Sequence, residues 1–285
     1  METLGLVGLG LVGQALSARL LEAGYSVAGC DVDNAACDRA RARGVDVVAR
    51  ADDLAGGCRT ILLSLPDSAA VDAVLWGGRG LGPACAAGHT LLDTTTARPG
   101  DTEAHHRRLS QGGVRFIDVA LVGSSREIGE GKGVALVGAR EEDADFRPVV
   151  DAFAAAVYFF DAPGGGHRAK LVVNLVLGLN RLVLAEGLAL AGKAGMDPGR
   201  VLEVLRNSGA YSRAMDVKGP RMIAGDFAPA ARLAQHAKDV GLIRELAAGL
   251  GARVPVSDLH AALLDEAIAA GLGNADNSAV IELFR

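Results

Sequence analysis

The fold is decided by the N-terminal stretch Thr3-Leu4-Gly5-Leu6-Val7-Gly8-Leu9-Gly10-Leu11-Val12-Gly13. Its first residues are mostly apolar, which indicates a short buried strand, and the residues from Leu11 to Ala23 indicate a helix that ends at Gly24. A second strand is expected from Ser26 to Cys30, directly before Asp31. A strand, a tight glycine turn, a helix and a second strand are the beginning of a parallel α/β sheet.

The turn has the pattern G-x-G-x-x-G, formed by Gly8, Leu9, Gly10, Leu11, Val12 and Gly13. Gly8 permits the tight turn, Gly10 lets a pyrophosphate approach the backbone, and Gly13 allows the helix to pack closely on the strand. The N-terminus of the helix offers unpaired N–H groups to phosphates. Asp31 would accept hydrogen bonds from the adenosine ribose and repel a 2′-phosphate. The stretch therefore predicts a dinucleotide site that favours NAD, with NADP as the alternative because the arginines at residues 39–43 could reach a phosphate.

Strand and helix patterns continue to alternate, which predicts a mostly parallel sheet with helices on both faces. Further strands are expected at Val45 to Ala49, Ile61 to Leu65, Thr90 to Asp93, Arg115 to Val119, Val134 to Val137 and Val157 to Phe160. Ligands bind beyond the carboxyl ends of such strands. We therefore expect the loops with Leu65, Pro66 and Asp67, and with Thr95 and Thr96, to face the cofactor; helix capping by Asp67 and Thr96 is the alternative interpretation.

After about Asp161 the strand signals stop and the rest of the chain is helical in pattern. The predicted fold is an α/β Rossmann domain with a doubly wound sheet at residues 1–161, followed by an all-α domain for substrate binding and dimerisation at residues 162–285. The second domain opens on Gly164-Gly165-Gly166-His167-Arg168-Ala169-Lys170-Leu171-Val172-Val173-Asn174. In a helix Lys170 and Asn174 project from one face, and the apolar residues that follow would desolvate the ammonium and make it fit for proton exchange.

Composition excludes several classes of protein. With a net charge of −5 and only short basic clusters in 285 residues, the chain is not expected to bind nucleic acid. Four cysteines without C-x-x-C spacing indicate reduced thiols in a cytoplasmic protein, and six histidines without a ligand pattern predict no metal. The N-terminus lacks the features of a signal peptide. The apolar run at residues 171–190 contains Asn174, Asn180, Arg181 and Glu186, which favours a buried core helix over a membrane span.

These motifs resemble those of the β-hydroxyacid dehydrogenase family, which includes 3-hydroxyisobutyrate dehydrogenase, tartronate semialdehyde reductase and glyoxylate/succinic semialdehyde reductases, within the 6-phosphogluconate dehydrogenase superfamily. The resemblance covers nearly the whole chain. It rests on five motifs: the glycine turn at residues 8–13, Asp93 to Pro99 (D-x-S-S-x-x-P in the family), Gly164 to Asn174 (G-x-G-x-x-x-K-x-x-x-N), Lys238-Asp239, and Gly271 to Ile281 (G-x-G-x-x-D-x-S-A).

The resemblance implies that Lys170 transfers the proton and that Asn174 orients the substrate oxygen while the nicotinamide exchanges hydride with the carbon. It also implies that Thr95 or Thr96 replaces the family's loop serines and that Lys238 helps to close the site over the cofactor. The substrate is expected to be a small carboxylate.

The substrate loop, residues 118–133, departs from the family pattern D-A-P-V-S-G-G, since Asp118 is followed by Val119-Ala120-Leu121-Val122-Gly123-Ser124. Val122 stands where the family has a carboxylate-binding serine. The backbone N–H groups of Gly123 and Ser124 could still bind an anion. Val173 replaces a second asparagine, so Asn174 alone remains of that amide pair.

Other functions remain in competition. The altered loop motivates an imine reductase of the same fold, although such enzymes usually lack a lysine at the position of Lys170. A phosphogluconate-type dehydrogenase would need a larger helical domain. A non-catalytic dinucleotide-binding module is disfavoured by the intact Lys170. The small and apolar residues of the helical half predict a homodimer or homotetramer.

Overall fold

The computed structural model describes residues 2–285. The chain divides into two compact units, one that ends at Lys170 and one from Leu171 to Arg285. This division falls inside the long helix α8 (Gly165–Lys193), whereas the boundary expected from the sequence, between residues 161 and 162, precedes that helix. The expected boundary stays a prediction.

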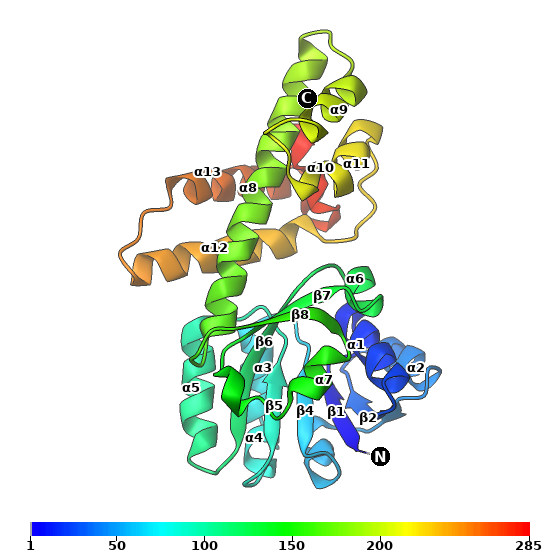
Figure 1. Cartoon of the computed structure of the whole chain (residues 1–285), viewed down its shortest axis with the longest axis vertical. Coiled ribbons are helices and arrows are strands. Elements are labelled where there is room, and N and C mark those ends of the chain that lie inside the picture. Colours follow the sequence, from blue (N-terminus) through cyan, green and yellow to red (C-terminus); the bar gives the residue numbers. More distant parts are fainter. Residues whose placement is uncertain (1) are drawn as a thin grey trace. The chain divides into compact units, whose positions relative to one another are not determined.

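The first unit is built on an eight-stranded sheet in the order β3-β2-β1-β4-β5-β6-β7-β8 (Figure 1). The strands are β1 (Thr3–Val7), β2 (Ser26–Cys30), β3 (Asp46–Val47), β4 (Thr60–Leu63), β5 (Thr90–Asp93), β6 (Arg115–Val122), β7 (Gly133–Val137) and β8 (Ala154–Phe159). Every neighbouring pair is parallel except β6 and β7. The predicted Rossmann-like, mostly parallel sheet followed by a helical region is confirmed.

Helices cover both faces of the sheet because successive strand residues point to opposite sides. These helices are α1 (Leu11–Glu22), α2 (Asn34–Arg41), α3 (Ser68–Trp76), α4 (Leu81–Ala84), α5 (Pro99–Ser110), α6 (Ser125–Gly129) and α7 (Arg147–Asp151). Leu6 and Leu62 pack in one core with residues of α1, α2, α6 and α7. Their neighbours Val7 and Leu63 pack in the other core with residues of α3, α4 and α5.

The edges of the sheet differ from the sequence prediction. The strand expected at Val45 to Ala49 shrinks to β3, because only Asp46 and Val47 pair with β2. Strand β6 runs on to Val122 because its last residues pair antiparallel with β7. Residues 118–122 of the expected substrate loop therefore lie within a sheet strand, and only the part from Gly123 onward is outside it.

Parallel pairing brings the functional loops to one edge of the sheet. Strands β1, β4, β5 and β6 are parallel neighbours, so the turns that follow them lie at the same edge. Strands β2 and β4 flank β1 on opposite sides, which places the glycine turn after β1 at a topological switch point of the sheet.

The second unit consists of helices around the part of α8 that follows Lys170. The others are α9 (Pro198–Arg206), α10 (Arg213–Val217), α11 (Gly219–Ala224), α12 (Leu233–Gly249) and α13 (Pro255–Ala269). Leu182, Leu184 and Leu188 of α8 pack in a core with Leu233 and Leu264. By length and composition α8 is the one helix among the described residues that could cross a membrane. In this helix 44% of the most apolar stretch is buried, and Leu182, Leu184 and Leu188 are among the buried residues. The interpretation as a buried core helix rather than a membrane span stays a prediction.

Candidate active site

The three glycines of the first turn are required for different physical reasons. Gly8 has a φ of +94°, and a Cβ there would lie 2.2 Å from the carbonyl oxygen of Ser64. A Cβ on Gly13 would lie 2.0 Å from the carbonyl oxygen of Gly8. A Cβ on Gly10 would meet no described atom within 4 Å. Gly8 and Gly13 are thus needed for folding, whereas Gly10 leaves open space at the N-terminus of α1, where no side chain caps the helix. A helix N-terminus with open space and no side-chain cap is the kind of site at which phosphate groups bind in proteins.

Asp31 is held against the glycine turn. Its carboxylate accepts hydrogen bonds from the backbone N–H of Leu9 at 2.6 Å and from that of Asp33 at 2.8 Å. Each oxygen can accept a further bond, so the carboxylate can still receive ribose hydroxyls. Arg39 lies 3.6 Å from Asp33 in an ion pair, and Arg41 is paired with Asp38, so two of the arginines that could reach a 2′-phosphate have other partners.

A hydrogen bond of Thr95 links the loops that follow β4 and β5. The hydroxyl of Thr95 accepts a hydrogen bond from the N–H of Leu65 at 3.2 Å, and the N–H of Thr95 donates to Asp93. Thr95 is buried and Thr96 is half-buried. Asp67 caps α3 by accepting from the N–H of Ala70, which supports the capping interpretation for that residue. The N-cap of α5 is Arg98, so Thr96 does not cap this helix.

Lys170 and Asn174 are both buried on helix α8, with 9% and 8% of their surface exposed. The amide Nδ2 of Asn174 donates to Oδ2 of Asp239 at 3.0 Å, and Nζ of Lys238 lies 3.2 Å from Oδ1 of the same carboxylate. Asp239 therefore fixes the orientation of Asn174 and leaves the amide oxygen and one N–H for a ligand. The sequence motif contains both Lys238 and Asp239 but implied a role only for Lys238, because the partner of Asp239 lies 65 residues away on α8.

A buried carboxylate anchors the start of α8. Asp118 of β6 is fully buried and accepts hydrogen bonds from the N–H groups of Gly164 at 2.8 Å and of His167 at 2.9 Å. A Cβ on Gly138 would lie 2.1 Å from this carboxylate, so glycine makes room for it. Asp118 satisfies two donors at the beginning of the helix that carries Lys170. The sequence offered one signal that we did not use, an aspartate inside an apolar strand.

The substrate loop is more constrained than the sequence suggested. Ser124 is the N-cap of α6, and both its N–H and its hydroxyl donate to Oε2 of Glu127, at 2.8 Å and 2.9 Å. While this capping box stands, Ser124 has no donor left for an anion, and Glu127 brings negative charge. Gly123 adopts a φ of +134°, and Val122 is half-buried at the end of β6.

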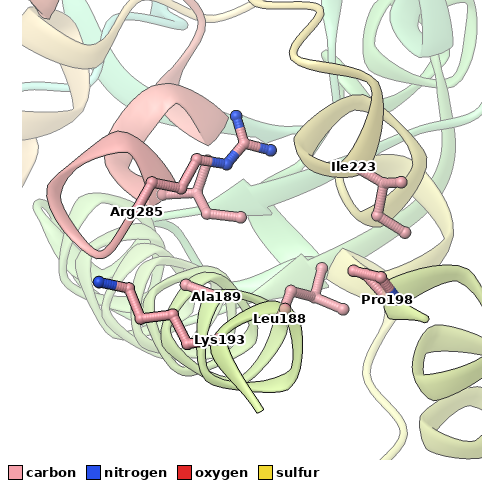
Figure 2. A pocket seen from close by; sticks show the side chains of 8 residues that line it. Leu188, Ala189, Lys193, Pro198, Ile223 and Arg285 are labelled. Carbon is pink, nitrogen blue, oxygen red and sulfur yellow. The ribbon is translucent and has the colours of Figure 1, made fainter. Parts of the chain in front are cut away.

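A hollow of about 300 Å³ lies at the other end of α8, between Leu188, Lys193, Pro198 and Arg285 (Figure 2). The guanidinium group that lines this hollow belongs to Arg285. It already donates hydrogen bonds to Glu282 and to the carbonyl of Met222. This hollow contains none of the predicted site residues. No group of three or more potential metal ligands occurs among residues 2–285.

Comparison with known proteins yields two family models. Residues 3–161 match the NAD-binding domain of 6-phosphogluconate dehydrogenase, and residues 164–284 match the model described as NAD-binding of NADP-dependent 3-hydroxyisobutyrate dehydrogenase. Together these matches take in both compact units.

Curated relatives and solved structures agree with these models. A 2-(hydroxymethyl)glutarate dehydrogenase of Eubacterium barkeri is 29% identical over 85% of this chain and 81% of its own. An L-threonate dehydrogenase of Cupriavidus necator is 29% identical over 99% and 96%. The structure of a 3-hydroxyisobutyrate dehydrogenase of Mycobacterium tuberculosis superposes with a TM-score of 0.91 at 26% identity, covering 100% of this chain and 99% of that one. An imine reductase of Streptomyces aurantiacus superposes with a TM-score of 0.66 at 22% identity, and the match covers 100% of both chains. This likeness shows a common fold alone.

Proposed function

Because the chain belongs to the β-hydroxyacid dehydrogenase family of NAD(P)-dependent oxidoreductases, we propose that Lys170 is the residue that gives and takes the proton in its reaction. The protein is a dehydrogenase or reductase acting on a small hydroxyacid. The observation that supports Lys170 is its burial on one face of α8 with Asn174, whose amide is fixed by Asp239. A buried ammonium beside an oriented amide suits proton transfer to a single oxygen.

The chemistry divides between cofactor and protein. The bound nicotinamide supplies a hydride in reduction or accepts one in oxidation. In reduction, the Lys170 ammonium gives its proton to the substrate oxygen as the carbonyl becomes an alkoxide. In oxidation, the neutral amine takes the hydroxyl proton. Asn174 hydrogen-bonds the same oxygen and keeps it within reach of Nζ.

For the cofactor we favour NAD. Asp31 stands beside the glycine turn with acceptor capacity for ribose hydroxyls, and its charge opposes a 2′-phosphate. The remaining cofactor contacts that we propose are the glycine turn with Leu9, Leu11 and Val12, the loops with Leu65, Pro66, Asp67, Thr95 and Thr96, and Lys238. Comparing kcat/KM for NAD and NADP in the wild type and in Asp31→Ser tests this choice, because the substitution should raise the NADP to NAD ratio by about 10-fold or more.

For the substrate carboxylate we propose backbone contacts at Val122 and Gly123. Ser124 contributes only if its capping box with Glu127 opens. Substitution of Glu127 by Gln, which keeps the shape of the cap and removes the charge, should therefore lower the KM for the acid. An unchanged KM would place the carboxylate elsewhere.

The test of the main proposal is an oxidation screen with NAD and NADP over 3-hydroxyisobutyrate, 3-hydroxypropionate, glycerate, threonate and 4-hydroxybutyrate. Lys170→Ala should lower kcat by about 100-fold to 10,000-fold while cofactor binding persists. Lys193→Ala is the matched control, because it removes an exposed lysine from the same helix. Activity that survives in Lys170→Ala would reject the role of this lysine. Turnover of a cyclic imine and of no hydroxyacid would favour the imine reductase alternative.

We further propose that the protein is a cytoplasmic homodimer or homotetramer. Exposed Val172, Val176, Val183 and Leu190 recur along α8 at helical spacing and form one apolar stripe, with 51–66% of each residue exposed. Such a stripe is covered in oligomers. Sedimentation should show an oligomer that Val183→Glu dissociates; a monomer at micromolar concentration would contradict this.

A further inference from the structure

A third polar side chain, Arg181, lies on the same face of α8 as Lys170 and Asn174. At about 100° per residue, the three side chains point within roughly 40° of one another. The rise from Asn174 to Arg181 is about 10 Å along the axis. Side chains of a helix tend to lean toward its N-terminus. The charge of Arg181 acts on Asp276, Lys218 and His260, so its guanidinium lies within electrostatic reach of these groups.

Arg181 is buried, with 9% of its surface exposed, and it lacks a partner of its own. None of residues 2–285 forms a hydrogen bond or an ion pair with its guanidinium. Burial lowers the pKa of Arg181 to about 10, so the side chain remains charged at neutral pH. A buried charge without hydrogen bonds is costly unless a partner completes it.

The carboxylate of Asp276 acts on Arg181 through its charge, but its hydrogen bonds and ion pairs are made with other groups. Asp276 is fully buried. Its carboxylate accepts hydrogen bonds from Nζ of Lys218 at 2.7 Å and from the hydroxyl of Ser278 at 2.7 Å, and it forms an ion pair with a guanidinium nitrogen of Arg221 at 3.3 Å. Asp276 raises the pKa of Arg181 through its charge and makes no bond to it. Lys218 and Arg221 contact Asp276, and Arg221 also pairs with Asp226 at 3.4 Å. Arg181 adds a third positive charge to these two carboxylates, and the positive charge that is left over favours an anion from outside.

The stretch of α8 between Asn174 and Arg181 carries no acidic residue. At Gly178 a Cβ would lie 2.6 Å from Nε2 of His236 and 2.8 Å from Cε1 of His260, so both imidazoles pack against the bare backbone there. Burial, together with the charge of Arg181, lowers the pKa of His260 to about 4 and keeps it neutral. Leu177 lies on the face of Lys170 and Arg181 and is 39% exposed. An apolar chain could lie over this leucine.

We propose that Arg181 binds the second carboxylate of a hydroxydiacid, whose carbinol group reacts at Lys170. The inference rests on the proposed function, since Lys170 and Asn174 define the reacting end. The carbinol is held at the polar start of α8, the methylene chain lies over Leu177, and the distal carboxylate pairs with the guanidinium in two parallel hydrogen bonds. The preferred substrates are β-hydroxyacids that carry a second carboxylate on a short methylene chain.

The experiment compares two substrates that differ only at the far end, 2-(hydroxymethyl)glutarate and 2-(hydroxymethyl)pentanoate, in which a methyl group replaces the distal carboxylate. The wild type should prefer the diacid in kcat/KM by about 100-fold, the typical effect of a buried charge pair. Arg181→Met should reduce this preference by about the same factor. Arg181→Lys keeps the charge but loses the planar guanidinium, so it should retain part of the preference for the diacid. This variant replaces Arg181→Met in the comparison if the methionine variant fails to fold.

Lys193→Met is the matched control, because it removes a cation from the same helix and should leave the preference unchanged. A folded Arg181→Met that keeps the full diacid preference, or a wild type that prefers the monoacid, would overturn the inference. Calorimetric titration of the diacid into NAD-loaded Lys170→Ala protein measures binding in the absence of turnover. The same titration with Arg181→Met added measures how much of that binding depends on Arg181. Turnover that does not depend on Lys170 would reject the proposed function, while this titration would still decide the role of Arg181.

Discussion

At the scale of single residues, the arrangement of Asn174 depends on Asp239. The carboxylate accepts one N–H of the amide at 3.0 Å and also faces Lys238. A side chain that touches no substrate can still set the rate, because a small misplacement of an orienting amide costs much of its effect. Asp239 is in this sense a positioning residue.

We predict that Asp239→Asn lowers kcat/KM by about 10-fold or more, with most of the loss in kcat. The substitution keeps the shape of the side chain but removes the charge that holds the Asn174 amide. Asp265→Asn is the control, since it removes an equal charge from an exposed position of the same unit. Steady-state kinetics with the best substrate of the screen measures the effect. A loss confined to KM would contradict the positioning role.

At the scale of elements, different glycines of the first turn are expected to serve folding and cofactor binding. In Gly10→Ala the new methyl group meets no atom of residues 2–285 within 4 Å, and the φ of −67° suits alanine. We predict a free energy of unfolding within about 0.5 kcal/mol of the wild type and a Kd for NAD raised by about 10-fold or more.

Gly13→Ala is the contrasting variant. Its Cβ would collide with backbone at 2.0 Å, which no rotamer change relieves, so this variant should lose more than about 3 kcal/mol of stability. Urea unfolding and cofactor titration measure the two effects. Equal destabilisation of both variants would mean that Gly10 is also a packing glycine.

The start of α8 permits a second prediction at this scale. Asp118→Ala leaves the buried N–H groups of Gly164 and His167 without an acceptor, which should cost about 2–4 kcal/mol of stability and lower kcat, since the turn before Lys170 loosens. Asp145→Ala, which removes an exposed carboxylate paired with Arg115, should cost less than about 1 kcal/mol. Unfolding in urea distinguishes the two. A stable Asp118→Ala protein would show that another group holds the helix.

Local patterns predicted the elements, and long-range contacts decided what those patterns left open. The spacing of Gly8, Gly10 and Gly13 predicted the turn because each role depends on neighbouring backbone. The pairing of Asp118 with the start of α8 joins residues 46 positions apart, and that of Asn174 with Asp239 joins residues 65 apart. No periodicity in the sequence encodes such partners. Likewise, the Ser124 capping box was visible as a motif, but its competition with anion binding became apparent only from the hydrogen bonds.

At the scale of the whole molecule, each compact unit buries a neutral histidine. In the first unit Nδ1 of His105 accepts a hydrogen bond from the indole of Trp76 at 3.0 Å, and burial lowers its pKa. In the second unit burial and the Arg181 charge lower the pKa of His260 to about 4. In mild acid both imidazoles take up a proton when the chain unfolds, because unfolding removes the burial that keeps them neutral. As the pH is lowered, both units should therefore become less stable.

The prediction for His260 can be worked out in sign and size. Its pKa is about 4 in the folded chain and about 6.5 when unfolded, so between these values the unfolded state binds the additional proton. The stability contributed by neutral His260 is complete above pH 6.5 and is lost as the pH falls toward 4. From pH 7.5 to pH 5 the loss is about 2 kcal/mol.

His260→Leu should therefore lose about 2 kcal/mol less than the wild type over this interval, whatever its stability at pH 7.5. The carboxylates and His105 titrate alike in both proteins and cancel in the comparison. Urea unfolding followed by far-UV circular dichroism at the two pH values measures the difference. Parallel losses in wild type and variant would mean that His260 takes up its proton in the folded state, which would require a nearby anion to offset the charge of Arg181.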